Sequence, residues 1–287
     1  MDITCEAIHG KSSVTTVTSD RSGAGSSASP GARTAFRGRM LRWQLGTVEA
    51  VWSETRRTKS FRLSVPGFGS FRPGQRVDIR LTAPDGYRTQ RSYSVASAPV
   101  TGTEPRTIDL TVELIEDGEV SPYFHEVVEP GDQLELRGPI GGPFTWTTTM
   151  GGPLLLVAGG SGIVPLMSML RHRSTQDQHE RQLAALLYSS RDMNDVIYRD
   201  ELAQMAADDV SFDLGLTLTR EQPKGWRGYA RRVDKPMLGE VINRLSTPAH
   251  SYVCGPTDFV ESVSTYLLEL GLPMDSIRTE RFGPTGT

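Results

Sequence analysis

The sequence predicts a two-domain protein, in which a six-stranded antiparallel Greek-key β-barrel precedes an open parallel α/β nucleotide-binding sheet. Short alternating runs between residues 45 and 136 are separated by turns rich in Pro, Gly and Asp, the pattern of a small barrel. From residue 154 onward, apolar runs alternate with helical patterns, which is typical of a parallel sheet with helices on both faces. We therefore expect a tail over residues 1–38, a barrel domain over 39–149 and an α/β domain over 150–287.

The composition argues against several classes of protein. A formal net charge of −3 offers no basic field for nucleic acid. The longest apolar run, residues 154–158, is far shorter than the roughly 20 residues that cross a bilayer. Two cysteines, Cys5 and Cys254, cannot form a four-cysteine iron–sulfur or zinc site. We expect no nucleic-acid partner, no membrane span, no bound metal and a cytoplasmic location.

The N-terminal tail has too few large apolar residues to form a core. Residues 1–38 are rich in Ser, Thr, Gly and Ala, which predicts disorder. The segment also lacks the apolar core of a secretory signal, and Met40 is an alternative start.

The barrel domain contains six predicted strands and one helix. The strands cover residues 46–52, 60–65, 76–81, 91–96, 107–115 and 133–136. Residues 107–114 alternate cleanly, so one face of that strand is buried and the other is wet. Ser121 and Pro122 read as a helix start, with the serine as N-cap and the proline in the first turn.

One strand of the barrel carries a group of residues suited to a flavin nucleotide. Alternation puts Arg91 and Tyr93 on one face and Ser92 and Ser94 on the other. An arginine offers a fork of donors to a phosphate, a tyrosine offers a flat ring to a planar ligand, and a serine hydroxyl can meet a heteroatom. The alternative interpretation is an ordinary polar strand edge.

The second domain begins after Gly151-Gly152-Pro153. Its predicted strands cover residues 154–158, 182–188, 211–218, 251–254 and 276–281, and its helices cover 163–171, 198–207, 236–245 and 258–270. A glycine turn at residues 159–162 joins the first strand to the first helix, the layout of a nucleotide-phosphate site. Pro165 stands where the full glycine motif has its third glycine.

These separated motifs, in this order, resemble the ferredoxin–NADP reductase superfamily over about residues 45–283. The resemblance depends on Arg91-x-Tyr93-Ser94, on Gly-Gly-Ser-Gly-Ile-x-Pro at 159–165 and on Tyr-Val-Cys-Gly-Pro at 252–256. It implies that the barrel holds a flavin and that the α/β domain holds a nicotinamide nucleotide.

The resemblance also implies roles for residues of the barrel. Arg91 would hold pyrophosphate, Tyr93 would pack along the isoalloxazine or ribityl region, and Ser94 would lie near flavin N5. Two further segments complete the predicted flavin site, which consists of Arg91, Ser92, Tyr93, Ser94, Val112, Glu113, Gly118, Glu119, Val120 and Ser121. Val112 and Glu113 match the segment beside the adenosine. Residues 118–121 match the turn whose amides hold the pyrophosphate, which favours FAD over FMN.

In the α/β domain, the resemblance assigns Gly160, Ser161 and Gly162 to the loop that admits the cofactor phosphates and nicotinamide. Cys254, Gly255 and Pro256 would lie beside the reacting carbons, although a buried cysteine at a strand end is more often plain packing. Glu280 and Phe282 resemble a closing Glu-x-aromatic, whose aromatic ring covers the flavin face. The predicted catalytic residues are Ser94, Cys254 and Glu280.

The strand ends favour NADPH over NADH as coenzyme. Ser190 and Arg191 stand where an NAD site has an acid, and with Arg220 they suit a 2′-phosphate. Asp192 is the counter-argument, because a shifted turn would let it accept a ribose hydroxyl.

The predicted function is a flavin-dependent NAD(P)H oxidoreductase that takes hydride from NADPH onto FAD and passes electrons to a separate acceptor. A ferredoxin is the leading candidate, and the basic residues Arg56, Arg57, Lys59, Arg72, Arg76 and Arg88 offer a surface for an acidic carrier. The alternatives are a reductase for free flavin, oxygen or a haem or molybdenum partner, and a binding subunit without turnover.

Overall fold

The first six strands pair into one antiparallel sheet in the order β4-β3-β6-β1-β2-β5. The computed structural model describes residues 41–99 and 107–282. The predicted tail with Cys5, the alternative start at Met40 and residues 283–287 lie outside them. The strands are β1 (Gln44–Thr55), β2 (Thr58–Ser64), β3 (Arg76–Thr82), β4 (Arg88–Ser94), β5 (Thr107–Glu113) and β6 (Gln133–Ile140).

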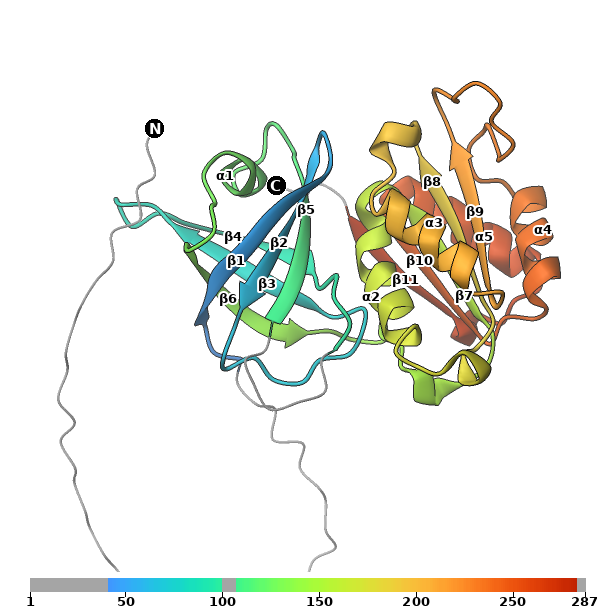
Figure 1. Ribbon diagram of the computed structural model, residues 1–287, viewed down its shortest axis with the longest axis horizontal. Helices are drawn as coiled ribbons and strands as arrows, with labels where there is room; N and C mark the ends of the chain where they lie inside the picture. The colour runs from blue at the N-terminus through green and yellow to red at the C-terminus, as the bar shows by residue number, and fades with distance from the viewer. Residues whose placement is uncertain (1–40, 100–106, 283–287) are drawn as a thin grey trace, which may run out of the picture.

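The sheet curls until its two edge strands meet. Val95, directly after β4, forms a bridge with Leu110 of β5, and the Ala96 amide donates to the Asp109 carbonyl over 2.8 Å. Alternate side chains then fill the interior, among them Phe61 and Leu110, which are fully buried. The predicted antiparallel barrel is confirmed (Figure 1).

One short helix covers an end of the barrel core. Helix α1 (Ser121–Glu126) turns Phe124 onto Phe61, with ring centroids 4.9 Å apart. The prediction that Ser121 caps this helix is wrong, because Val120 occupies the N-cap position. The Ser121 hydroxyl instead accepts a hydrogen bond from the Ile115 amide at 3.0 Å, so it is engaged with the preceding turn.

The second domain is a five-stranded sheet in the order β11-β10-β7-β8-β9, and its pairings are all parallel. Its strands are β7 (Leu154–Gly159), β8 (Ala184–Ser190), β9 (Phe212–Leu218), β10 (His250–Pro256) and β11 (Ile277–Phe282). Its α-helices are α2 (Ile163–Arg173), α3 (Arg199–Asp208), α4 (Lys235–Leu245) and α5 (Thr257–Glu269).

Helices lie on both faces of this sheet, as the sequence predicts (Figure 1). Leu154 and Leu156 of β7 belong to the core formed with α2 and α3. Leu155 and Val157 belong to the core formed with α4 and α5. A strand buried on both faces explains why residues 154–158 form an unbroken apolar run.

Helix α2 joins the two domains. The Ser168 hydroxyl donates to the Ser97 carbonyl at 2.6 Å, and the Arg171 guanidinium donates to the Ala96 carbonyl at 2.9 Å. Both acceptors closely follow β4, while α2 itself begins at the glycine turn after β7. These bonds therefore bring the residues of β4 and the glycine turn to the same side of the molecule. In the part of the chain that the structure describes, no helix is long and apolar enough to span a membrane.

Candidate functional site

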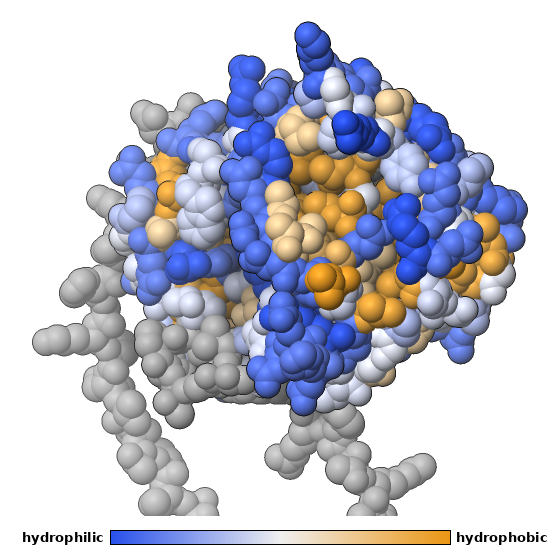
Figure 2. All heavy atoms as spheres, turned by 45° about the vertical axis from the view of Figure 1, so that its right-hand side comes forward, coloured by the Kyte–Doolittle hydropathy of each residue, from blue (hydrophilic) through white to orange (hydrophobic). Residues whose placement is uncertain are grey.

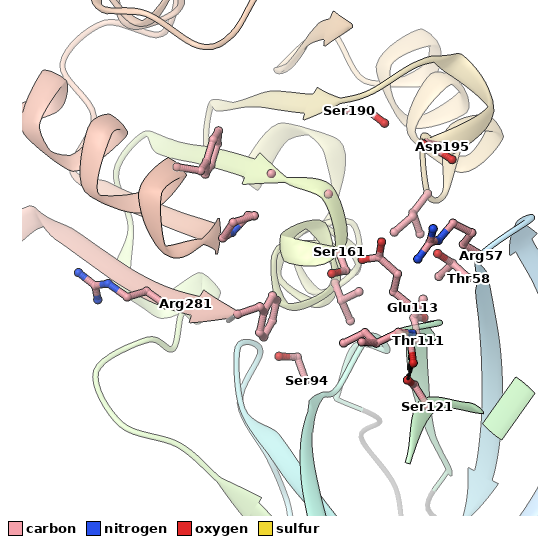
Figure 3. Close-up of a pocket in the computed structure, with 18 of the residues that line it drawn as sticks. Arg57, Thr58, Ser94, Thr111, Glu113, Ser121, Ser161, Ser190, Asp195 and Arg281 are labelled. Carbon is pink, nitrogen blue, oxygen red and sulfur yellow. Dashed lines mark hydrogen bonds between the residues drawn. The ribbon is translucent and has the colours of Figure 1, made fainter. Parts of the chain in front are cut away.

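A cleft of about 1390 Å³ lies between the barrel and the α/β domain. Figure 3 shows Ser94, Thr111, Glu113 and Ser121 of the barrel on one side and Ser161 and Ser190 of the second domain on the other. The cleft crosses the carboxyl ends of the parallel strands, the edge at which open α/β sheets bind ligands.

The four motif residues of β4 all line this cleft. Arg91 and Ser92 are exposed, whereas Tyr93 is half-buried with its ring centroid 5.4 Å from that of Phe124. Burial raises the pKa of the Tyr93 hydroxyl above its usual range, so the ring is neutral at physiological pH. A neutral ring fixed by a second aromatic ring can provide a flat face for a planar ligand.

Ser94 carries a buried hydroxyl that has no hydrogen-bond partner within the described chain. The residue is only 4 % exposed, and its side chain projects toward the cleft in Figure 3. A buried polar atom without a partner is costly. The hydroxyl is therefore placed to bond a heteroatom of a ligand that enters the cleft.

Strand β5 presents a different pair of residues from the predicted one. Glu113 lines the cleft, but Val112 is fully buried in the barrel core, so its side chain faces away from any ligand. Thr111 shares the Glu113 face and also lines the cleft. The alternation of residues 107–114 contains this signal, because it places Thr111 with Glu113 and Val112 opposite.

The loop of residues 118–121 lines the cleft along its whole length. Within it, the Glu119 carboxylate accepts hydrogen bonds from Thr89 Oγ1 at 2.8 Å and Tyr87 Oη at 2.9 Å. It also lies 3.5 Å from the Arg91 guanidinium. The hydrogen bonds from Thr89 and Tyr87 lower the pKa of Glu119, so this carboxylate is charged at neutral pH.

The glycine turn after β7 approaches neighbouring backbone closely. Gly160 has a φ of 54°, which glycine adopts without strain. A Cβ on Gly162 would stand 2.1 Å from the Cys254 carbonyl oxygen, so a side chain there would collide with β10. Gly160 and Ser161 line the cleft, whereas Gly162 does not.

The carboxyl ends of β8 and β9 and the turns after them hold the three residues predicted to select the coenzyme. Ser190 is buried, Arg191 and Arg220 are exposed, and all three line the cleft. The Arg220 amide donates to the Arg191 carbonyl at 2.8 Å, so the two turns run side by side. Within the described residues, neither guanidinium forms an ion pair. Asp192 faces its own turn, where it accepts hydrogen bonds from the Asn194 and Asp195 amides.

Strands β10 and β11 place Cys254 beside Glu280 in register. Cys254 is fully buried in the core under α2 and does not line the cleft, and neither does Gly255. Glu280, Phe282 and Pro256 do line it. Burial raises the pKa of the Glu280 carboxyl to about 7, against the opposing effect of Arg76.

Several lining residues were not predicted. They include Arg57, Thr58, Thr111, Asp195, Arg232 and Phe259. Arg57 ends the turn between β1 and β2, and Thr58 begins β2, which reaches the cleft because Thr58 pairs with Glu113. Nothing in the sequence around these residues indicates that register.

An antiparallel barrel joined to an open parallel sheet, with one cleft across both, defines a two-domain dinucleotide-dependent oxidoreductase. Residues 45–145 match the family described as "Oxidoreductase FAD-binding domain", and residues 156–265 match "Oxidoreductase NAD-binding domain". The chain is 36% identical over 218 residues to ferredoxin–NADP reductase B of Sorangium cellulosum, which covers 74% of this chain and 85% of that protein. The chain therefore belongs to the ferredoxin–NADP reductase superfamily.

Two further relatives extend this comparison. The glycine betaine monooxygenase reductase subunit of Pseudomonas aeruginosa is 30% identical over 249 residues, covering 86% of this chain. This chain spans only 65% of that protein's length. The FAD/NAD-binding domain of nitric oxide dioxygenase from Vibrio cholerae superposes with a TM-score of 0.72 at 26% identity. That match covers 84% of this chain and 98% of the domain.

Proposed function

We propose that this chain is a flavin-dependent NAD(P)H oxidoreductase that takes hydride from NADPH through FAD and delivers electrons to a separate acceptor. The observation that carries the proposal is the single cleft lined by both the Arg91–Ser94 motif and the glycine turn. A flavin and a nicotinamide that share one cleft can approach each other directly.

The barrel residues fit FAD. The Ser94 hydroxyl needs a partner, Tyr93 offers its ring, and Arg91 offers donors to a phosphate. Bound FAD would accept a hydride and release electrons singly, which is chemistry that the protein itself cannot supply. The chain's part is to hold the ring against Tyr93, bond its heteroatom through Ser94 and keep water away from the ring.

Glu280 and Cys254 are proposed to act in different ways. Glu280 lines the cleft and has a pKa of about 7, so its carboxyl can hold a proton there at neutral pH. Cys254 lies behind that carboxyl, and burial raises the pKa of its thiol well above the usual range. The buried thiol therefore acts as packing beneath the site, and a direct catalytic role would require the cleft to reach it.

The coenzyme proposal depends on charge at the ends of β8 and β9. Arg191 directly follows Ser190, the last residue of β8, Arg220 lies in the turn after β9, and Asp192 is occupied by backbone amides. A 2′-phosphate would gain charge-assisted bonds there, whereas a 2′-hydroxyl would find no free acid at Asp192. This arrangement supports NADPH as the preferred donor.

The acceptor is proposed to be a ferredoxin or a ferredoxin-like centre in an oxygenase system. The sequence has two cysteines, too few for a four-cysteine cluster, and the relatives include proteins named as reductase subunits or components. Among the predicted docking residues, Arg56, Arg72 and Arg88 are exposed and form no ion pair within the described chain. Arg57 and Lys59 are engaged by Leu114 and His125 carbonyls, and Arg76 lines the cleft.

Anaerobic absorbance titration of the purified protein tests the proposal. NADPH is expected to bleach a bound flavin at far lower concentration than NADH does. Bleaching by NADH alone would overturn the coenzyme assignment but keep the enzyme class. A protein that takes up no FAD would overturn the proposal as a whole, and one that binds FAD without bleaching would be a binding subunit.

A further inference from the structure

The Glu119 carboxylate lies beside Arg91, the residue expected to hold the flavin pyrophosphate. Its Oε2 atom lies 3.5 Å from the Arg91 guanidinium, the group proposed to clamp the pyrophosphate. Two further donors fix the carboxylate in place, since Tyr87 and Thr89 each hydrogen-bond one of its oxygens. Both of these donors come from the β3–β4 hairpin that also carries Arg91. The carboxylate is thus fixed to that hairpin by three contacts.

The loop that carries Glu119 is itself part of the expected pyrophosphate site. Glu119 stands between Gly118 and Val120 in the loop whose amides are proposed to hold the same pyrophosphate, and all of these residues line the cleft. An anion bound between this loop and Arg91 would therefore meet the Glu119 carboxylate. The Glu119 carboxylate and a bound phosphate carry like charges and therefore repel each other. Water reduces this repulsion without removing it, and salt weakens it further.

We propose that Glu119 competes with the flavin pyrophosphate for Arg91, and so holds the affinity of the barrel for FAD below the level that Arg91 alone would give. This inference rests on the proposed FAD site. Its consequence is that FAD binds reversibly and that Arg91 is kept oriented toward the cleft by a partner from its own chain. Phosphate-free flavins do not compete with Glu119, so their affinity is independent of it.

A second role for a carboxylate at this place would have the opposite effect. Glu119 could accept hydrogen bonds from the hydroxyls of a ribose or ribityl chain, as acids do at dinucleotide sites. In that case removal of its charge would weaken FAD binding. The sign of one affinity change therefore separates the two roles.

The experiment compares wild type with Glu119→Gln, both freed of flavin and titrated with FAD and with riboflavin, with flavin fluorescence as the readout. We expect the Kd for FAD to fall about five- to tenfold in the variant, the size of one removed like charge near a surface. The Kd for riboflavin is expected to stay the same. The gain with FAD is expected to shrink in about 1 M salt. Glu126→Gln, an exposed residue of α1 outside the cleft, removes the same charge and serves as the control.

The Arg91→Gln background provides a second measurement. There, Glu119→Gln is expected to change FAD affinity less than in the wild-type background, because no guanidinium remains to be released. Unchanged or weaker FAD binding by Glu119→Gln, or an equal gain with riboflavin, would overturn the inference. A wild-type protein that binds no FAD would instead overturn the proposed function.

Discussion

At the scale of single residues, Glu280 lies in an environment that moves the pKa of its carboxyl close to neutral pH. It is largely buried at the end of β11 beside Cys254, and Arg76 is the cation that offsets its burial. Its pKa of about 7 lies above the ordinary value of 4.5. A raised acid pKa means that the folded protein keeps a proton that the unfolded chain has already released.

This difference predicts a stability that falls as pH rises. Below about pH 4.5 the carboxyl is protonated in both states and contributes nothing. Between about pH 4.5 and 7 the unfolded chain ionises first, so the fold loses stability, by up to about 3 kcal/mol once the pH exceeds 7. Glu280→Gln removes the charge and should be more stable than wild type by that amount at pH 8 and equal to it at pH 4.

The measurement is urea unfolding of the two holoproteins at several pH values, with Glu129→Gln as an exposed control. The control is expected to show no such divergence between pH 4 and 8. A constant difference between wild type and Glu280→Gln across this range would show that Glu280 does not keep its proton in the fold.

The sequence predicted which segments belong to the site better than it predicted which of their side chains face the cleft. Arg91, Ser92, Tyr93 and Ser94 all line the cleft, although strand alternation alone would put them on two different faces of β4. Cys254 and Gly255 do not reach it, although they are next to Pro256, which does. A strand end that is buried under a helix cannot be recognised from its own residues, because the helix lies elsewhere in the sequence.

At the scale of elements, hydrophobic patterns together with turn and helix-start signals predicted every strand and every α-helix of the described chain. The capping of α1 was the exception. A Ser-Pro pair is typical of a helix start with the serine as cap. Here the Ser121 hydroxyl instead accepts a hydrogen bond from the Ile115 amide, which lies six residues upstream in a turn that no sequence pattern predicted. Short helices are sensitive to such competition, because few hydrogen bonds fix their ends.

The paired turns after β8 and β9 carry a prediction about the coenzyme. Their backbone bonds hold Arg191 and Arg220 at one edge of the cleft. The double variant Arg191→Gln/Arg220→Gln should weaken NADPH binding roughly 100-fold, about tenfold for each lost charge-assisted contact. NADH carries no 2′-phosphate, so its binding should change only a few-fold. Competition titrations with both coenzymes would measure the two changes.

Arg227→Gln removes a similar exposed charge outside the cleft and provides the matched control for that double variant. If NADPH and NADH affinities fell equally in the double variant, the arginines would hold the shared part of the coenzymes, and the preference for NADPH would have to come from other residues.

At the scale of the whole molecule, the sequence predicted two domains in their order but not how they pack. The contacts that join them connect residues far apart in the chain, such as Ser168 with Ser97 and Tyr252 with Thr145. No local pattern contains that information. Apolar side chains also gather on the surface that Figure 2 shows. The distribution of hydrophobic residues alone therefore does not identify the domain interface.

Tyr198 of the α/β domain forms a buried side-chain contact with the barrel. It precedes α3 in a left-handed conformation, with a φ of 58°, which is uncommon for a bulky residue. Its buried hydroxyl donates to Thr111 Oγ1, which in turn contacts the Ser60 hydroxyl at 2.8 Å. The Arg171 guanidinium lies 4.9 Å from the centre of its ring. The uncommon backbone conformation of Tyr198 thus places its side chain in a contact between the two domains.

These contacts predict that Tyr198 makes the two domains unfold together. Tyr198→Phe keeps the ring and should cost about 1 kcal/mol for the lost hydrogen bond, whereas Tyr198→Ala should cost about 3–5 kcal/mol because it also leaves a cavity. In urea, flavin fluorescence reports loss of FAD from the barrel, and far-UV circular dichroism reports both domains. The two signals should coincide in wild type and separate in Tyr198→Ala.

Tyr229→Phe is the control, because the Tyr229 hydroxyl bonds Glu240 within one domain. The two signals should stay coincident in that variant. If the signals coincided in Tyr198→Ala as well, the other interdomain contacts, those of α2 and of Tyr252, would be enough to couple the domains, and Tyr198 would only fill space between them.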